Sequence, residues 1–402
     1  MTEPVADKSD LEAVSLIRIF TDCIILGCTA WGGYMSLLAQ AQTRFVTKRK
    51  WISDKGFLDM IALVSMLPGP QAVNAIALLG YRLRGWTGFF SALIGTVLPG
   101  FLFILFLWKC YYYFSDFQTL TRAVTIGVLP PLAMIIAKAA QMQALGSTRT
   151  LKEKILAAVC ALSLLLLPYW GTSILVIIAS ALVAIFFWKK EVSQLEIPHK
   201  AMPVSHIVLC IIPVCFIIFN IFPSLLPDLL LAKIGLVFAG ISTSLFGGGL
   251  VVVPLLQGLL INDFGWLEQS TFNVALAASQ LTPGPVLSVA TFAGMQLAGI
   301  AGAALATIGT YFPTAFITVG ASSISEKFLS MPVFQKAMAG IRCAVVGLIA
   351  GAAITLLLKL PFGLYPLRVL LLVANAFFLV WFFKLPPYIS LPLSCLLAWI
   401  IF

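Results

Sequence analysis

Charged side chains are scarce in this sequence, and histidine is nearly absent. Only 10% of its 402 residues are charged, whereas 61% are hydrophobic. A soluble domain carries roughly a quarter charged residues and about half apolar ones. The two histidines, His199 and His206, share one central segment, so they cannot build an intramembrane metal site, and no HExxH motif occurs. The composition excludes an ordinary soluble domain and a histidine-based metalloenzyme.

Motifs for other catalytic classes are also missing. The chain has no GxSxG, no GxxxxGK(S/T) and no GxGxxG, and no two acids share an apolar span. Nucleophilic hydrolysis and nucleotide binding therefore have no residues to support them. Eight cysteines lie mostly within apolar runs without a CxxC pair, which excludes a disulfide or zinc framework. We expect no enzymatic activity, no metal and no cofactor, so that transport would run on an ion or exchange gradient.

Long apolar runs fill most of the chain. Segments of about 15 to 30 hydrophobic residues alternate with short basic or Pro/Gly-rich loops, a pattern typical of polytopic helical membrane proteins. Transmembrane barrels are excluded because their strands alternate apolar and polar residues. The net charge of +10 comes from basic residues in loops, so we expect a lipid bilayer and no nucleic acid as partner. The polar amino terminus lacks a basic start and a cleavage site, which predicts a cytosolic lead-in.

Two motifs occur twice in the same order. Trp31-Gly32-Gly33 precedes Pro68-Gly69-Pro70, and Phe246-Gly247-Gly248 precedes Pro283-Gly284-Pro285, with 215 positions between equivalent residues. An ordered series of matches at this spacing indicates a duplication. The predicted organisation is a first repeat at 1–145, linking transmembrane helices and a cytoplasmic loop at 146–227, a second repeat at 228–360, and C-terminal transmembrane helices at 361–402.

The loops after the two Gly motifs differ in charge. RFVTKRKWISDK holds five basic residues and one acid, whereas the equivalent LLINDFGWLEQS holds no basic residue and two acids. The positive-inside rule places the first loop in the cytoplasm and the second outside. The expected fold class is therefore an all-α polytopic membrane protein with two inverted-topology repeats, whose broken or re-entrant helices meet at the midplane.

Each Pro-Gly-Pro triplet interrupts a segment that could otherwise span the membrane once. In residues 57–81 the triplet lies in the middle, where proline must break the helix. Each flank has about 11 residues, or ~16 Å, which is half of the ~30 Å hydrocarbon core. The segment is a re-entrant hairpin or one broken crossing, and Lys55, Arg82 and Arg84 on its two sides favour the hairpin. The Gly-Gly segments leave the same choice, which gives about nine or about thirteen crossings.

Broken helices at mid-membrane depth can bind an anion. Residues 71–77 and 286–292 would each begin a half-helix whose free N–H groups and dipole favour negative charge, as at the substrate sites of inverted-repeat transporters. Neutral side chains nearby could donate hydrogen bonds to an oxyanion without preventing its release. The alternative is that Pro and Gly only kink packed helices. The predicted substrate-binding residues are Gly32, Gly33, Ser65, Pro68, Gly69, Pro70, Gln71, Asn74, Gly247, Gly248, Gly249, Gln280, Thr282, Pro283, Gly284 and Pro285.

Asp59 is the acid that lies within the apolar pattern before the first triplet. An ionisable residue in such a position could couple transport to a proton or cation. Its equivalent in the second repeat is Val274, so such a role would be asymmetric. Because Asp59 follows Lys55 by four residues, it could instead be a first-turn partner of the helix dipole. Both interpretations stay open.

These motifs resemble the chromate transporter family. The resemblance rests on WISDKGFLDMIALVSMLPGPQAVNAIALLGYRLRGWTGFFSALIGTVLPG in the first half, and on SLFGGGLVVVPLLQ and WLEQSTFNVALAASQLTPGPVLSVATFAG in the second. It implies an inner-membrane secondary carrier that exports chromate, an oxyanion close to sulfate in shape and charge. The sequence departs from the family pattern at Trp31, where Phe is usual, and at Ser65, which stands where the second half has Gln280.

Two other functions are weighed against chromate export. The chain could carry another small anion, such as sulfate or an organic acid. It could also be a scaffold or sensor that transports nothing, although such a protein would gain nothing from helices broken at mid-membrane depth. A homodimer is a candidate assembly.

Overall fold

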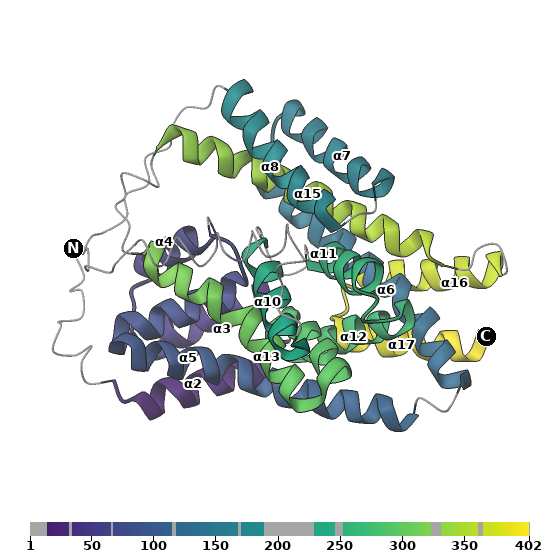
Figure 1. The fold of residues 1–402 in the computed structure, drawn as a ribbon, viewed down its shortest axis with the longest axis horizontal. Helices are drawn as coiled ribbons and strands as arrows, with labels where there is room; N and C mark the ends of the chain where they lie inside the picture. Colours follow the sequence, from purple (N-terminus) through teal and green to yellow (C-terminus); the bar gives the residue numbers. More distant parts are fainter. Residues whose placement is uncertain are drawn as a thin grey trace. The chain divides into compact units, whose positions relative to one another are not determined.

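The computed structural model describes residues 14–31, 34–65, 67–114, 118–167, 170–188, 229–245, 252–322, 331–360 and 365–401. Regular secondary structure in these ranges is entirely helical, which confirms the expected all-α fold (Figure 1). Among the described helices, four stretches are long and apolar enough to cross a membrane, and they confirm the polytopic prediction. These stretches are Gln71–Tyr113, Ile126–Ser147, Val289–Ala321 and Gln335–Leu358.

The helices form two series that follow the sequence duplication. The first series is α2 (Leu16–Thr29), α3 (Tyr34–Gln42), the π-helix η1 (Thr43–Lys48), α4 (Asp54–Val64), α5 (Gln71–Phe114), α6 (Gln118–Ser147), α7 (Leu151–Leu166) and α8 (Trp170–Phe187). The second series is α10 (Leu230–Thr243), α11 (Val252–Gln257), the π-helix η4 (Gly258–Asp263), α12 (Gln269–Gln280), the 3-10 turn η5 (Val286–Ser288), α13 (Val289–Ala321), α15 (Pro332–Leu358), α16 (Pro366–Phe377), the π-helix η6 (Phe378–Phe382) and α17 (Pro387–Ile401).

The duplication extends to individual hydrogen bonds. The π-helices η1 and η4 begin 215 residues apart, at Thr43 and Gly258. Before η1, Gln42 donates through Nε2 to Asp54 Oδ1 at 2.7 Å, and before η4, Gln257 donates through Nε2 to Gln269 Oε1 at 3.1 Å. Each bond ties the residue before the π-helix to the first residue of the next helix. The two copies therefore share local structure as well as sequence.

Helices α5 and α13 are each two helical arms joined by a tight turn. Non-helical backbone occurs at Arg84 and Gly85 in α5, and at Ala298 and Gly299 in α13, where both glycines have φ +61°. The first arm of α5, residues 71–83, is about 13 residues or ~20 Å long, too short to cross a ~30 Å hydrocarbon core. Half-helices thus follow both Pro-Gly-Pro triplets. In the second copy a 3-10 turn at 286–288 precedes the α-helix, so α-helical geometry starts three residues later than predicted.

Small residues let the two arms of each hairpin approach closely. A Cβ atom on Gly80 would lie 2.9 Å from the carbonyl carbon of Gly88, and one on Gly294 would lie 2.7 Å from that of Gly302. Side chains larger than hydrogen would separate the arms, because backbone already occupies that space. The hairpins hold the start of each half-helix, next to the Pro-Gly-Pro triplet, at a fixed position against the long arm.

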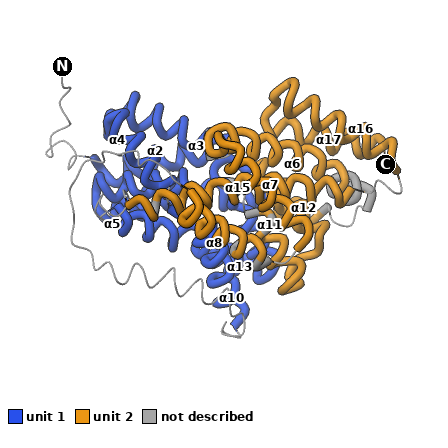
Figure 2. The backbone as a smooth tube through the Cα atoms, turned by 90° about the horizontal axis from the view of Figure 1, so that it is seen from above, with its two compact units in different colours: residues 1–106, 196–249, 282–325 blue, residues 107–195, 250–281, 326–402 orange. Residues whose placement is uncertain are grey.

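The chain divides into two compact units, and each unit contains parts of both repeats (Figure 2). Unit 1 comprises residues 1–106, 196–249 and 282–325, and unit 2 comprises residues 107–195, 250–281 and 326–402. Both Pro-Gly-Pro triplets belong to unit 1. In unit 1, α2 packs against the long arm of α5, and α10 packs against α13. The compact units therefore cut across the two sequence repeats.

In unit 2, helices from different parts of the duplication also pack against one another. Helix α15 of the second repeat packs against α6 of the first repeat and against the linking helices α7 and α8, and the C-terminal helix α17 packs against α6. The closest approaches occur at glycine: a Cβ on Gly347 would lie 2.7 Å from Cys160 Cβ, and one on Gly340 would lie 2.7 Å from Ala184 Cβ. Close approach through small residues is a common way to pack helices in a membrane, where burial from water gives no driving force.

Candidate functional site

The first Pro-Gly-Pro triplet connects α4 to α5 and is held by the second repeat. Gly69 has φ +105°, a conformation that side-chain-bearing residues rarely adopt. Its N–H donates to the carbonyl of Leu245 at 2.6 Å. The fully buried Asn74 donates from Nδ2 to the Pro68 carbonyl at 3.3 Å and accepts from Thr314 Oγ1 at 3.4 Å. The triplet is thus fixed by contacts with α13 and with the residue after α10.

The second triplet repeats this arrangement against the first repeat. Gly284 has φ +97°, and its N–H donates to the carbonyl of Ala30 at 2.9 Å. Ala30 and Leu245 are 215 positions apart, as are Gly69 and Gly284. Each triplet therefore binds the residue that precedes the Gly motif of the other copy. Reciprocal contacts of this kind arise when two equivalent elements are related by an approximate twofold axis.

The glycine amides of the triplets do not serve as free anion donors, because both donate to carbonyl groups of the protein. Among the described residues beside the triplets, the first turn that follows each triplet is where backbone N–H groups lack helical partners. In α5 the first helical bond runs from the Asn74 N–H to the Pro70 carbonyl at 3.0 Å, so the amides of residues 71–73 have no acceptor within their own helix. Within the described part of the chain, the predicted anion donors are therefore the N–H groups at the helix ends and the neutral side chains beside them.

The remaining predicted substrate-binding residues do not all lie in the same compact unit. Ser65 follows α4 and donates to the Ala62 carbonyl at 2.8 Å, while Gln71, Thr282 and Pro285 are buried in unit 1. Gln280 ends α12 in unit 2, where it is 7% exposed and its Nε2 has no hydrogen-bond partner among the described residues. The five motif glycines lie outside the described residues: Gly32, Gly33, Gly247, Gly248 and Gly249.

Asp59 is the sixth residue of α4, which begins at Asp54. The acid in the first helical turn is Asp54, so the helix-dipole alternative applies to that residue and not to Asp59. Asp59 is half-buried, its Oδ2 atom has no hydrogen-bond partner within the described part of the chain, and the charge of Arg82 acts on it. These features keep Asp59 a candidate for ion coupling.

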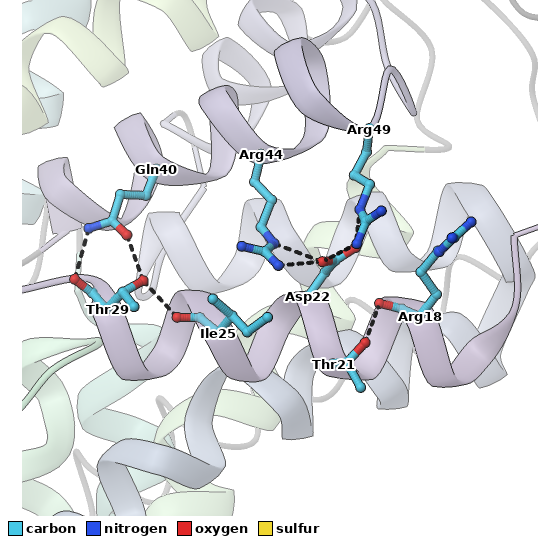
Figure 3. Close-up of polar contacts among 8 residues, drawn as sticks. All are labelled: Arg18, Thr21, Asp22, Ile25, Thr29, Gln40, Arg44 and Arg49. Atoms are coloured by element: carbon cyan, nitrogen blue, oxygen red, sulfur yellow. Dashed lines mark hydrogen bonds and ion pairs between the residues drawn. The ribbon is translucent and has the colours of Figure 1, made fainter.

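A buried ion cluster in unit 1 is a feature that the sequence interpretation missed. Asp22 of α2 is 0% exposed and binds Arg44 and Arg49, which lie within the π-helix η1 and directly after it (Figure 3). Its Oδ1 accepts from Arg44 Nε at 2.8 Å and Nη2 at 2.6 Å, and its Oδ2 accepts from Arg49 Nε at 2.7 Å. The acid inside the apolar run of α2 was the signal that could have revealed a buried charge, although its partners lie 22 and 27 residues further along the chain.

The ion cluster has no counterpart in the second repeat. The residues 215 positions after Asp22, Arg44 and Arg49 are Val237, Leu259 and Phe264. The second copy has apolar side chains at all three equivalent positions. No group of three His, Cys, Asp or Glu side chains among the described residues could hold a metal ion.

Comparisons with known proteins give one consistent family. The family model described as "Chromate transporter" matches residues 17–186 and 232–400. A "Probable chromate transport protein" of Synechococcus elongatus is 30% identical over 356 residues, 86% of this chain and 85% of the relative. A "Chromate transport protein" of Cupriavidus metallidurans is 28% identical over 82% of this chain and 80% of the relative. An uncharacterized transporter of Methanocaldococcus jannaschii is 25% identical over 88% of this chain and 87% of the relative. No solved structure matches the chain.

Proposed function

The chain belongs to the chromate transporter family, and we propose on this premise that it is a secondary transporter that moves chromate, or a similar tetrahedral oxyanion such as sulfate, out of the cell. Relatives named as chromate transport proteins align with most of its length, including both repeats. The proposal places the chain in the cytoplasmic (inner) membrane, among lipids, as a monomer or homodimer.

The observation that carries this proposal is that, within unit 1, each triplet donates a hydrogen bond to the residue before the Gly motif of the other repeat. The amides of Gly69 and Gly284 anchor the triplets to Leu245 and Ala30, so two half-helices start from fixed positions. The positive ends of helix dipoles stabilise negative charge, and neutral donors near them suit an anion that must be released. A scaffold or sensor would need neither the breaks nor their exchange, which argues against the non-transporting alternative.

Transport assays in inverted membrane vesicles test the substrate and the direction together. If the chain exports chromate, inverted vesicles should accumulate labelled chromate, excess sulfate should reduce this uptake, and collapsing the proton gradient shows whether protons drive it. Vesicles from cells that lack the protein are the control. Uptake of a labelled organic acid without chromate or sulfate uptake would contradict the oxyanion proposal and support the other small-anion carrier.

The inverted arrangement of the repeats predicts opposite accessibility of two matched loops. We expect the cysteine of a Lys48→Cys variant to react with a membrane-impermeant thiol reagent only from the cytoplasm, and that of an Asn262→Cys variant only from outside. Both positions are exposed, and the native cysteines would be replaced by alanine beforehand. Both single-cysteine variants should react in permeabilised cells, which controls for reactivity. Labelling of both positions from the same face would contradict inversion.

A further inference from the structure

The hairpin that follows the second triplet carries two buried hydroxyl groups that no described residue satisfies. Ser288 is 3% exposed and Tyr311 is 1% exposed, and neither Ser288 Oγ nor the Tyr311 hydroxyl has a hydrogen-bond partner among the described residues. Buried polar groups in native proteins are nearly always paired with protein, water or ligand. The two groups on one hairpin are therefore candidates for hydrogen bonding to a bound ligand or to water.

Ser288 lies in the first turn after the second Pro-Gly-Pro triplet. It is the last residue of the 3-10 turn η5 and directly precedes α13, and its backbone is already helical, with φ -59° and ψ -11°. The extended residue at the start of this helical stretch is Pro285, so Ser288 is not in the conformation of a capping residue and its side chain makes no capping bond. Its hydroxyl therefore lies in the first helical turn after the triplet without a bond to its own helix.

The register of the hairpin places Tyr311 opposite Ser288. Thr291 on the short arm and Thr307 on the long arm share a hydrogen bond between their Oγ1 atoms at 2.8 Å. Ser288 precedes Thr291 by three residues, and Tyr311 follows Thr307 by four, so each lies one turn further along on the same face of its arm. In antiparallel arms the two hydroxyl-bearing residues then face each other at the end next to the triplet.

The first repeat has no hydroxyl at any of the four equivalent positions. Ser288, Thr291, Thr307 and Tyr311 correspond to Val73, Ile76, Leu93 and Val97 at offsets of 214 or 215. At the offset of 214 that relates Gly80 to Gly294, the equivalents of Ser288 and Thr291 are Asn74 and Ala77. The same hairpin therefore folds without a hydroxyl at any of the four positions, and its fold does not require them. Their presence in the second repeat alone indicates that they have a function there which the first repeat lacks.

The space beside the glycine of each triplet also differs between the two repeats. A Cβ on Gly69 would lie 2.5 Å from Thr314 Oγ1, whereas a Cβ on Gly284 would meet nothing closer than the Gly27 carbonyl oxygen at 3.4 Å. Thr314 corresponds to Gly100 at the offset of 214, so the first repeat supplies glycine where the second supplies threonine. The position of a Cβ on Gly69 is therefore occupied by Thr314, whereas a Cβ on Gly284 would have room.

We propose that the hydroxyl groups of Ser288 and Tyr311 donate hydrogen bonds to the transported oxyanion. The substrate is then selected by the hairpin α13 of the second repeat and not by its counterpart in the first. This inference rests on the proposed function and identifies residues that carry it. A tetrahedral dianion accepts hydrogen bonds on every oxygen, and two neutral donors beside the positive end of α13 can bind it without a basic side chain.

Conservative removal of each hydroxyl tests the proposal. We expect Tyr311→Phe and Ser288→Ala each to raise the KM for chromate in vesicles by about tenfold, and to reduce the increase in Tm that sulfate gives to the purified protein. The Tm without anion should stay equal or rise, because an unsatisfied buried hydroxyl is removed. The matched control is Thr318→Val, which removes a fully buried hydroxyl of α13 that donates to the Thr314 carbonyl at 2.8 Å. It should keep the wild-type KM.

The outcomes separate this inference from the proposed function. If the wild-type protein transports chromate while Tyr311→Phe and Ser288→Ala leave the KM unchanged, the inference is overturned and the function stands. The same rise in KM in Thr318→Val would also overturn it, since the effect would then follow from any change in packing. Wild-type protein that moves neither chromate nor sulfate would overturn the proposed function and this inference with it.

Discussion

Replacing Gly69 by alanine should unfold or inactivate the protein, whereas the same change at Gly284 should be far milder. A Cβ on Gly69 would lie 2.5 Å from Oγ1 and 2.7 Å from Cγ2 of Thr314, and Gly69 also has φ +105°. Overpacking costs about 1–3 kcal/mol and the strained backbone about 1–3 kcal/mol more. For Gly284→Ala only the backbone cost applies, because the nearest atom lies at 3.4 Å. Thermal unfolding and chromate uptake measure both variants.

A second substitution shows whether steric overlap with Thr314 causes the loss. Thr314→Gly copies Gly100 of the first repeat, so Gly69→Ala combined with Thr314→Gly should recover the overpacking part of the loss and retain the backbone part. Thr314→Gly alone is the control, because it removes the Thr314 bond to Asn74 and adds a flexible residue to a helix. Equal losses of stability for Gly69→Ala and Gly284→Ala would contradict the asymmetry between the triplets.

The sequence predicted the breaks and the duplication because both depend on local chemistry. Proline cannot continue a helix, and glycine between two prolines permits the positive φ found at Gly69 and Gly284. The half-helices that follow the triplets were predicted for the same reason. The break near Gly85 was predicted from Arg82 and Arg84, which lie just after the segment 57–81. The turn at Gly299 was not predicted, because a glycine in an apolar run is compatible with a continuous helix.

The partners of the triplets could not be predicted from one sequence. Hydrogen bonds from Gly69 to Leu245 and from Gly284 to Ala30 join residues far apart in the chain, and no periodicity encodes such pairing. The predicted cradle takes its N–H groups from residues 71–77 and 286–292, and the amides of Gly69 and Gly284 cannot add to it because these exchanged bonds occupy them. The hydroxyl of Tyr311 was not predicted as a site residue for a related reason. A tyrosine is common in an apolar helix, and only the structure shows that its hydroxyl has no partner among the described residues.

Replacing Asp22 by alanine should destabilise unit 1 strongly. Asp22 is fully buried and forms ion pairs with both Arg44 and Arg49, whose side chains are 20% and 35% exposed. Removing one partner of a buried ion pair costs about 3–5 kcal/mol, and we expect the lower end because both arginines reach solvent. The loss should appear as a lower Tm and reduced expression. Arg49→Ala is the matched comparison and should cost less, because Asp22 keeps its two bonds to Arg44.

The triple substitution Asp22→Val, Arg44→Leu and Arg49→Phe distinguishes a structural role of the cluster from a role in transport. It introduces the residues of the second repeat at the equivalent positions, Val237, Leu259 and Phe264. Apolar replacement of a whole buried ion cluster is often neutral or stabilising, so the Tm should return to near the wild-type value. Lys48, Lys50 and Lys55 keep the loop basic, so its predicted cytoplasmic side should not change.

If the triple variant folds and transports at the wild-type rate, the cluster only joins α2 to η1. If it folds but does not transport, the charges of the cluster take part in transport and do not only join α2 to η1.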